Sequence, residues 1–184
     1  MVDAEPFLLI SVSTAGGTSG LRVTVWRNLR ALGALYLQQS VCLLPAREEI
    51  ARQVRRLVGQ VLAKGGTGQV LTVTFADPRE LASVVDQFNV ARDAEYGEIL
   101  ERTPSLLAEL AAETVRGRAT YAEVEESEAD LERFRTWIAK IAARDYFGAT
   151  GRAEAEAAIA QCAEALAEFE AAAVAAETGD GTRP

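Results

Sequence analysis

Residues 21–45 pass from a helical pattern through one glycine into two short β-type runs, and few folds have this order. Three leucines and a valine recur at helical spacing and predict one buried stripe: Leu21, Val25, Leu29 and Leu32. Gly33 is a typical end for such a helix. Residues 34–38 and 41–44 then predict a hairpin, and Pro45 ends its second strand.

The flanking residues complete a βαββαβ pattern. They supply, in order, a strand at 7–12, a glycine-rich loop at 15–20, an amphipathic helix at 46–64, a turn at 65–68 and a β-branched strand at 69–75. This is the order of the ferredoxin-like split unit, in which both helices lie on one face of a four-stranded antiparallel sheet. We therefore predict an α+β fold with a ferredoxin-like domain over residues 1–77.

The second half of the chain has helical patterns throughout. Asp77, followed by Pro78 and then Glu80, forms a strong helix start. Thr103 and Pro104 predict the start of another helix. That helix is predicted to end at Gly117.

An antiparallel helical hairpin is predicted over about residues 120–177. Thr120 and Glu123 form a capping box at its start, and apolar residues recur at intervals of three and four on both sides of a glycine-containing break. An alanine-rich stripe over residues 159–173 permits close packing, either within the chain or against a second copy. We expect residues 78–184 to form a helical segment that packs onto the sheet without being an independent globule. We also expect a homodimer, because a chain of this size cannot readily cover both the open sheet face and the stripe.

The net charge of −8 conceals an asymmetry along the chain. Residues 1–80 carry nine Arg and Lys against six Asp and Glu, whereas residues 81–184 carry ten against twenty-one. A basic first half can bind a polyanion on one side of the molecule. The acidic total argues against sequence-independent nucleic-acid binding over the whole surface.

The composition excludes several kinds of chemistry. The chain has no histidine, so imidazole metal ligation and histidine-based acid–base catalysis are excluded. Cys42 and Cys162 are far apart in sequence and are expected to be buried free thiols. No apolar run approaches the length of a membrane span and no secretory leader is recognisable, so we expect a cytoplasmic protein. We also expect no metal and no cofactor.

One face of the first helix has the chemistry of a nucleic-acid contact. Arg22, Trp26 and Arg30 recur at i, i+4 and i+8, which places an aromatic ring between two guanidinium groups. Such a face suits a phosphate backbone or a base stack. The alternative is that the ring covers the edge of the core while the arginines are merely solvated. The candidate DNA-binding residues are Arg22, Trp26, Arg27, Arg30, Arg52, Arg55 and Arg56.

The loop before that helix is a second candidate. Backbone amides at a helix start favour an anion, so a tetrahedral oxyanion held by Gly17, Thr18, Ser19 and Gly20 is one interpretation. An ordinary surface loop is the other, because the lysine and spacing of a nucleotide-binding P-loop are missing. The glutamates within residues 123–128 point to different sides of a helix and do not converge on one ion. We therefore interpret them as a solvated helix start and not as a metal site.

Four blocks of this sequence resemble the N-terminal region of the ChrB family of bacterial chromate-resistance regulators. They are FLLISVS, VWRNLRALGALYLQQSVCLLP, DQFNVARDAEYGEIL and ADLERFRTWIAKIAARDYF, within residues 7–147. A weaker similarity extends to the PaaX transcriptional repressors. The resemblance implies a cytoplasmic, dimeric, DNA-associated regulator of oxyanion-resistance genes, with an oxyanion such as chromate as the candidate effector.

The sequence also departs from these families. Full-length chromate regulators carry a further C-terminal sensor domain, which we expect this chain to lack, and PaaX-type repressors place a winged helix before the first strand. Nucleases related to this module hold a metal with an aspartate at the end of that strand, where this chain has residues 10–13 without a carboxylate. We therefore expect no enzymatic activity. A non-catalytic dimerising interaction module that does not bind DNA remains the alternative function.

Overall fold

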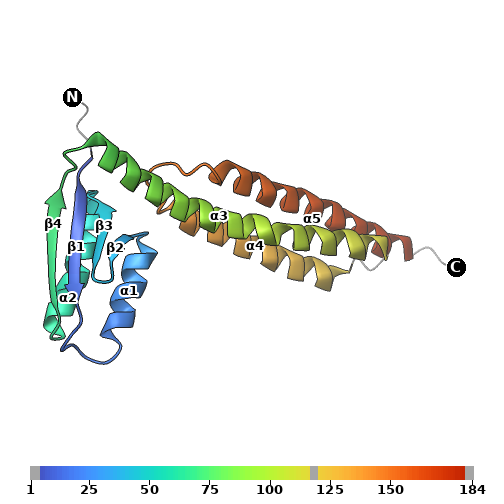
Figure 1. Cartoon of the computed structure of the whole chain (residues 1–184). Coiled ribbons are helices and arrows are strands. Elements are labelled where there is room, and N and C mark those ends of the chain that lie inside the picture. Colours follow the sequence, from blue (N-terminus) through green and yellow to red (C-terminus); the bar gives the residue numbers. More distant parts are fainter. Residues whose placement is uncertain (1–4, 117–119, 181–184) are drawn as a thin grey trace. The chain divides into compact units, whose positions relative to one another are not determined.

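The structure is a computed structural model that describes residues 5–116 and 120–180, with side chains as far as residue 175. Its elements are β1 (Phe7–Ser13), α1 (Leu21–Ala31), β2 (Leu35–Gln38), β3 (Val41–Pro45), α2 (Glu48–Ala63), β4 (Thr67–Val73), α3 (Pro78–Val115), α4 (Tyr121–Ala142) and α5 (Arg152–Asp180) (Figure 1). They form two compact units, which we call the sheet unit (residues 1–88) and the helical unit (residues 89–184). These units meet within α3, whereas the sequence places the domain boundary after residue 77. None of the described helices is both long and apolar enough to cross a membrane.

The sheet unit contains a four-stranded sheet in the order β2-β3-β1-β4. Every neighbouring pair of strands is antiparallel, as predicted. β1 is a central strand: Phe7 pairs with Pro45 of β3 on one side and with Val73 of β4 on the other. Because side chains alternate along a strand, Leu8, Ile10 and Val12 point to one face, where all three are buried.

Helices α1 and α2 cover this face (Figure 1). α1 contributes three residues of the predicted stripe, Leu21, Val25 and Leu29, all buried, while Leu32 at its C-cap is half-buried. α2 buries one side of an amphipathic helix at Ile50, Ala51, Val54, Leu57, Val58 and Val61. The apolar spacing of each helix therefore predicted the side that faces the sheet.

The opposite face of the sheet is covered in part by the first turns of α3. Phe7 stacks on Phe88 of α3 with 6.2 Å between ring centroids, and meets Phe75 edge-on at 5.5 Å. On the same face, Leu71 of β4 is 52% exposed and Leu37 of β2 is 46% exposed. Part of this sheet thus presents apolar side chains to solvent.

β4 begins and ends two residues earlier than the predicted strand 69–75. The turn is made by Gly65, whose φ of +84° favours glycine, and the chain is extended again at Thr67. Gly68 belongs to the strand, where it pairs with Val12 of β1. α2 approaches it so closely that an added Cβ would lie 3.0 Å from a methyl group of Val58. The glycines that the sequence places in one turn therefore have two different roles.

α3 is one continuous helix, so the predicted new start at Thr103 is wrong. Pro104 lies inside the helix on its exposed side, where its missing N–H costs one intrahelical hydrogen bond. Buried residues continue at helical spacing through the proline, at Ile99, Thr103 and Leu106. Packing of this face offsets the lost hydrogen bond. The predicted end at Gly117 lies outside the described residues.

The helical unit has a hydrophobic core of its own. The expectation that residues 78–184 pack onto the sheet without being an independent globule stays a prediction. α3 contributes Tyr96, Ile99, Leu106 and Leu110 to a cluster that also contains side chains of α4 and α5. The stripe of α5 lies within this cluster: Ile159, Cys162, Leu166, Phe169 and Ala173 are all buried. α4 and α5 pack against each other, and the hydroxyl of Thr120 accepts a hydrogen bond of 3.4 Å from the amide of Glu123 at the start of α4.

Asp145 ties the loop between α4 and α5 to the core of the helical unit. Its carboxylate accepts hydrogen bonds of 3.0 Å from the amides of Gly148 and Ala149, and one of 3.2 Å from the Tyr96 hydroxyl. Burial, followed by the charge of Asp145, raises the pKa of Tyr96 to about 12, so the phenol stays protonated and keeps donating. Asp145 and Tyr96 therefore stabilise the fold of the helical unit.

Asp145→Ala should therefore destabilise the helical unit. It leaves three donors without their acceptor, and we expect a loss of about 2 kcal/mol or more in the free energy of unfolding, measured by urea titration with circular dichroism. The control is Asp86→Ala, an equal change of charge at an exposed position of α3, which should stay within about 0.5 kcal/mol of the parent. Equal stability of the two variants would contradict this account of the loop.

Candidate functional site

The polar side of α1 brings an aromatic ring and arginines together as predicted from their spacing. The guanidinium carbon of Arg30 lies 5.1 Å from the centre of the Trp26 ring, which is a cation–π contact. Trp26 is 47% exposed, and Arg22, Arg27 and Arg30 are all exposed. Within the described residues, none of these three arginines forms an ion pair with a carboxylate.

The candidate arginines of α2 differ from one another. Arg52 lies 3.0 Å from a carboxylate oxygen of Glu49 and 3.9 Å from one of Glu48, so its charge is already compensated. Arg55 and Arg56 are exposed and have no such partner in the described part of the chain. α2 therefore offers a weaker positive surface than its sequence indicates.

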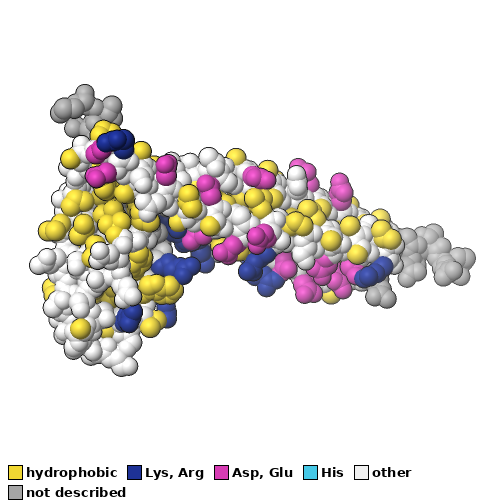
Figure 2. Space-filling model, in the orientation of Figure 1, with side chains coloured by type: hydrophobic (Ala, Val, Ile, Leu, Met, Phe, Trp, Pro, Cys, Tyr) yellow, Lys and Arg dark blue, Asp and Glu magenta, His cyan; other side chains and the backbone are white. Residues whose placement is uncertain are grey.

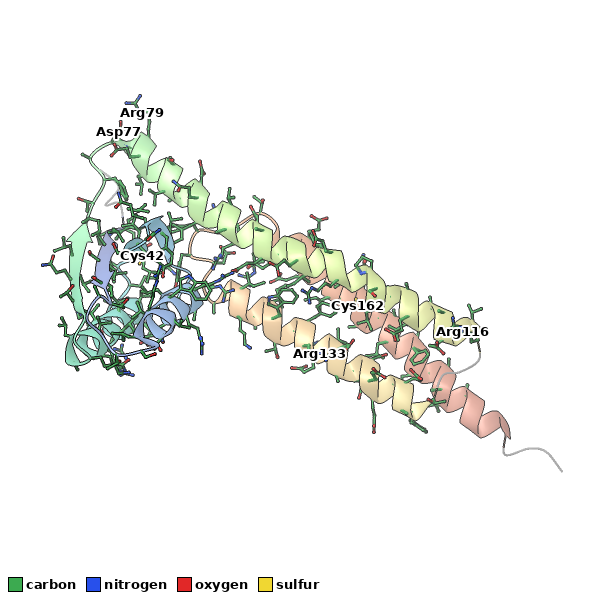
Figure 3. The ribbon with its side chains drawn as sticks, turned by 60° about the horizontal axis from the view of Figure 1, so that its bottom comes forward. Cys42, Asp77, Arg79, Arg116, Arg133 and Cys162 are labelled. Atoms are coloured by element: carbon green, nitrogen blue, oxygen red, sulfur yellow. The ribbon has the colours of Figure 1, made fainter. Side chains whose placement is uncertain are left out.

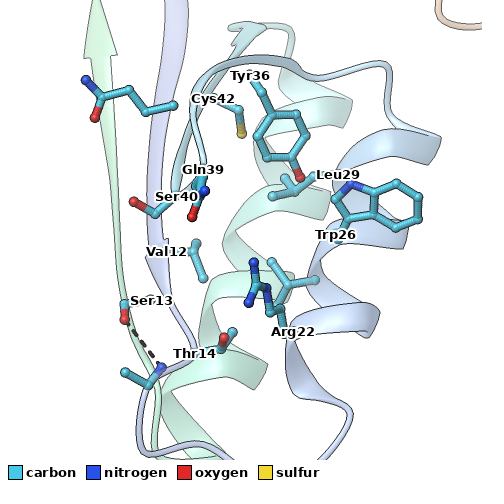
Figure 4. A pocket seen from close by; sticks show the side chains of 13 residues that line it. Val12, Ser13, Thr14, Arg22, Trp26, Leu29, Tyr36, Gln39, Ser40 and Cys42 are labelled. Carbon is cyan, nitrogen blue, oxygen red and sulfur yellow. Dashed lines mark hydrogen bonds between the residues drawn. The ribbon is translucent and has the colours of Figure 1, made fainter.

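A pocket of about 590 Å³ lies between α1 and the strands of the sheet unit (Figure 4). Arg22 and Trp26 of α1 both line it, and the guanidinium group of Arg22 projects into the space in front of the strands. The remaining lining comes from the end of β1 and the chain after it, from the inner side of α1, and from the β2–β3 hairpin: Val12, Ser13, Thr14, Ala15, Val25, Leu29, Tyr36, Gln38, Gln39, Ser40 and Cys42.

Several of these lining residues were not recognised from the sequence, among them Thr14, Tyr36 and Ser40. Alternation along β2 could have indicated Tyr36, because its neighbours Leu35 and Leu37 point to the opposite face of the sheet. The register pairs Tyr36 with Cys42, and both side chains point to the face that carries the helices. Only the antiparallel register could show that this pair faces α1.

The pocket has one fixed positive charge. Among its lining residues Arg22 is the only one that is charged, and no acidic side chain lines it. Burial raises the pKa of the Cys42 thiol to about 12, and burial together with the neighbouring Cys42 raises the pKa of the Tyr36 phenol. At neutral pH both groups are therefore protonated, and the phenol can donate a hydrogen bond.

The glycine-rich loop before α1 uses part of its backbone internally. The amide of Gly17 donates to the carbonyl of Thr14 at 3.1 Å, and that of Thr18 donates to the carbonyl of Lys64 at 3.3 Å. A Cβ on Gly17 would lie 2.6 Å from a methyl group of Leu21, so close packing accounts for this glycine. The predicted anion site at the loop thus rests on Ser19 and Gly20, and it stays a prediction.

The arginines of the helical unit are largely paired with acids, in contrast to those of α1. Arg144 binds Glu95 at 2.9 Å, Arg116 binds Glu113 at 2.6 Å, and Arg133 pairs with Asp130. Figure 3 labels Arg116 and Arg133 on the helices of this unit. Arg92, Arg135 and Arg152 likewise have carboxylate partners. Acidic side chains spread over the helical unit on the face in Figure 2. Nowhere among the described residues do three or more Cys, Asp or Glu side chains gather as a metal site would require.

Comparison with known proteins gives a match to a family model. The family model described as "Protein ChrB, N-terminal" matches residues 22–180 and so covers α1, the pocket hairpin and most of the helical unit. No curated protein and no solved structure matches the chain significantly.

The raised pKa of Cys42 predicts a pH dependence of stability. Between pH 9 and about 12 the unfolded chain releases this thiol proton while the folded chain keeps it, so the free energy of unfolding falls as the pH rises. This group alone contributes a slope of about 1.4 kcal/mol per pH unit. We expect Cys42→Ala to unfold with a shallower pH dependence than the parent in urea titrations above pH 9. Identical slopes for variant and parent would show that Cys42 titrates normally.

Proposed function

This chain belongs to the ChrB N-terminal family, and we propose that it is a regulator of chromate-resistance genes that contacts DNA through the polar face of α1. Family membership associates the chain with chromate resistance and with regulation. The contact with DNA, the residues that make it and the cytoplasmic location that it requires belong to the proposal. The site residues are Arg22, Trp26, Arg27 and Arg30, with Arg55 and Arg56 of α2 as a secondary surface.

The observation that carries the proposal is the distribution of uncompensated arginines. A phosphate contact gains most from a guanidinium group without a carboxylate partner, because that partner would have to be displaced. α1 has three such arginines and no acidic residue in its sequence, whereas most arginines of the helical unit are paired. Trp26, stacked by Arg30 and half-exposed, adds a surface on which a base or sugar could pack.

Two further features are part of the proposal. We assign the sheet unit to the ferredoxin-like folds, on its βαββαβ order and on the central position of β1 between β3 and β4.

We also propose a homodimer. The stripe of α5 is buried within its own unit, so the exposed apolar part of the sheet around Leu71 is the surface that supports a dimer.

Replacing the three arginines of α1 tests the DNA contact. The triple variant Arg22→Ala, Arg27→Ala and Arg30→Ala should bind duplex DNA more weakly than the parent. The log–log dependence of its affinity on salt should also flatten, by about 0.9 for each phosphate contact removed. Fluorescence anisotropy with a labelled duplex from the region upstream of the gene, between about 50 and 200 mM salt, measures both effects.

A matched triple variant controls for net charge. Arg116→Ala, Arg133→Ala and Arg135→Ala remove the same charge from paired, exposed positions of the helical unit and should leave the salt slope unchanged. If both triple variants bind like the parent, the α1 face is not the DNA contact. If the parent binds no DNA at moderate salt, the non-catalytic interaction module replaces the regulator as the proposed function.

The dimer is tested by solution mass. Multi-angle light scattering at micromolar concentration should give twice the chain mass of 19.7 kDa, and Leu71→Lys should shift the particle toward the monomer because a charge is then buried at the interface. A parent of monomer mass would remove the dimer from the proposal.

A further inference from the structure

The pocket beside α1 is not needed for a contact with DNA. Phosphate contacts are made by exposed guanidinium groups, whereas this pocket extends from α1 to Tyr36, Cys42 and Val12 on the strands behind it. A volume of about 590 Å³ lies within the range of small-molecule sites, about 300 to 1,000 Å³. The space is large enough for a ligand with a ring and a charged group.

The polar lining selects for an anion. Arg22 supplies the only charge and has no carboxylate partner among the described residues, so its donors are available to a ligand. Thr14, Ser40 and Tyr36, which carry hydroxyl groups, also line the pocket. No lining side chain is acidic, so nothing in the pocket repels a negative group.

The remaining lining selects for an apolar body on that anion. Val12, Val25 and Leu29 are buried and form the inner wall together with Cys42. Trp26 also lines the pocket and still has almost half of its surface exposed. A bare inorganic anion would leave these surfaces uncovered, whereas a flat organic ring would pack against them.

We propose that this pocket binds a small organic anion, whose carboxylate or phosphate is held by Arg22 and whose flat apolar body packs beside Trp26. Occupation of the pocket takes Arg22 and Trp26 away from the DNA-contacting face of α1, so the ligand weakens binding to DNA. This second statement rests on the proposed function, whereas the ligand site itself does not.

Trp26 provides the readout for the ligand site. In the full-length variant Trp137→Phe it is the only tryptophan, so its fluorescence reports the pocket directly. Benzoate and phenyl phosphate should each change this fluorescence with saturation at millimolar concentration or below, while phenol and inorganic sulfate should bind at least about tenfold more weakly. Calorimetry with the parent chain repeats the comparison without any substitution. Sulfate or chromate binding as tightly as phenyl phosphate would overturn the organic class, and no saturable binding of either organic anion would overturn the site.

Two single variants separate the ligand site from the DNA contact. Arg22→Ala should weaken binding of benzoate and phenyl phosphate about tenfold or more, whereas Arg27→Ala, on the same helix outside the pocket, should leave it unchanged. Equal ligand affinity of the two variants would overturn the role of Arg22. In DNA titrations, saturating phenyl phosphate should lower the affinity of the parent by about tenfold. An unchanged DNA affinity would overturn the antagonism, and ligand binding by a parent that binds no DNA would leave the pocket intact while removing the proposed function.

Discussion

The pairing of β1 on both of its edges is the constraint on which the sheet unit depends. β1 joins the hairpin strand β3 to the last strand β4, and its register with each sets which side chains reach the helix-covered face. Leu8, Ile10 and Val12 are buried for this reason, and α1 and α2 acquire a surface against which to pack. A shift of one residue would turn these side chains to the other face and would remove Val12 from the pocket.

Much of this architecture could be predicted because its signals are local. Apolar periodicity gave the inward sides of α1 and α2, and the alternation around residues 34–44 gave the hairpin. The errors came where packing overrides a local signal. Pro104 has the sequence signature of a helix start, yet the buried face of α3 continues through it. Gly68 has the signature of a turn, yet it is a strand residue on which α2 packs closely.

Only part of the candidate site could be predicted from the sequence, because only some of its residues are related by local spacing. Arg22, Trp26 and Arg30 lie on one helix, so spacing alone places them together. Tyr36 and Ser40 come from the hairpin, and only the fold brings them to the other side of the same pocket. Nor does spacing indicate which arginines are compensated. Arg52 and Arg55 look alike in the sequence, but Arg52 is paired with Glu49. A count of charged residues therefore overestimates the uncompensated positive charge of α2 relative to that of α1.

The continuity of α3 has a consequence for how the protein can be divided. Domains are usually joined by exposed, extended linkers, which are also where proteases cut and where truncated fragments are best ended. Here the junction between Phe88 and Asn89 lies in the interior of a helix. A cut at this point would create two new helix ends, each with up to four backbone groups that have lost their intrahelical partners. Fragments of this protein should therefore keep additional turns of α3 beyond the junction, and limited proteolysis would not reveal its two-part organisation.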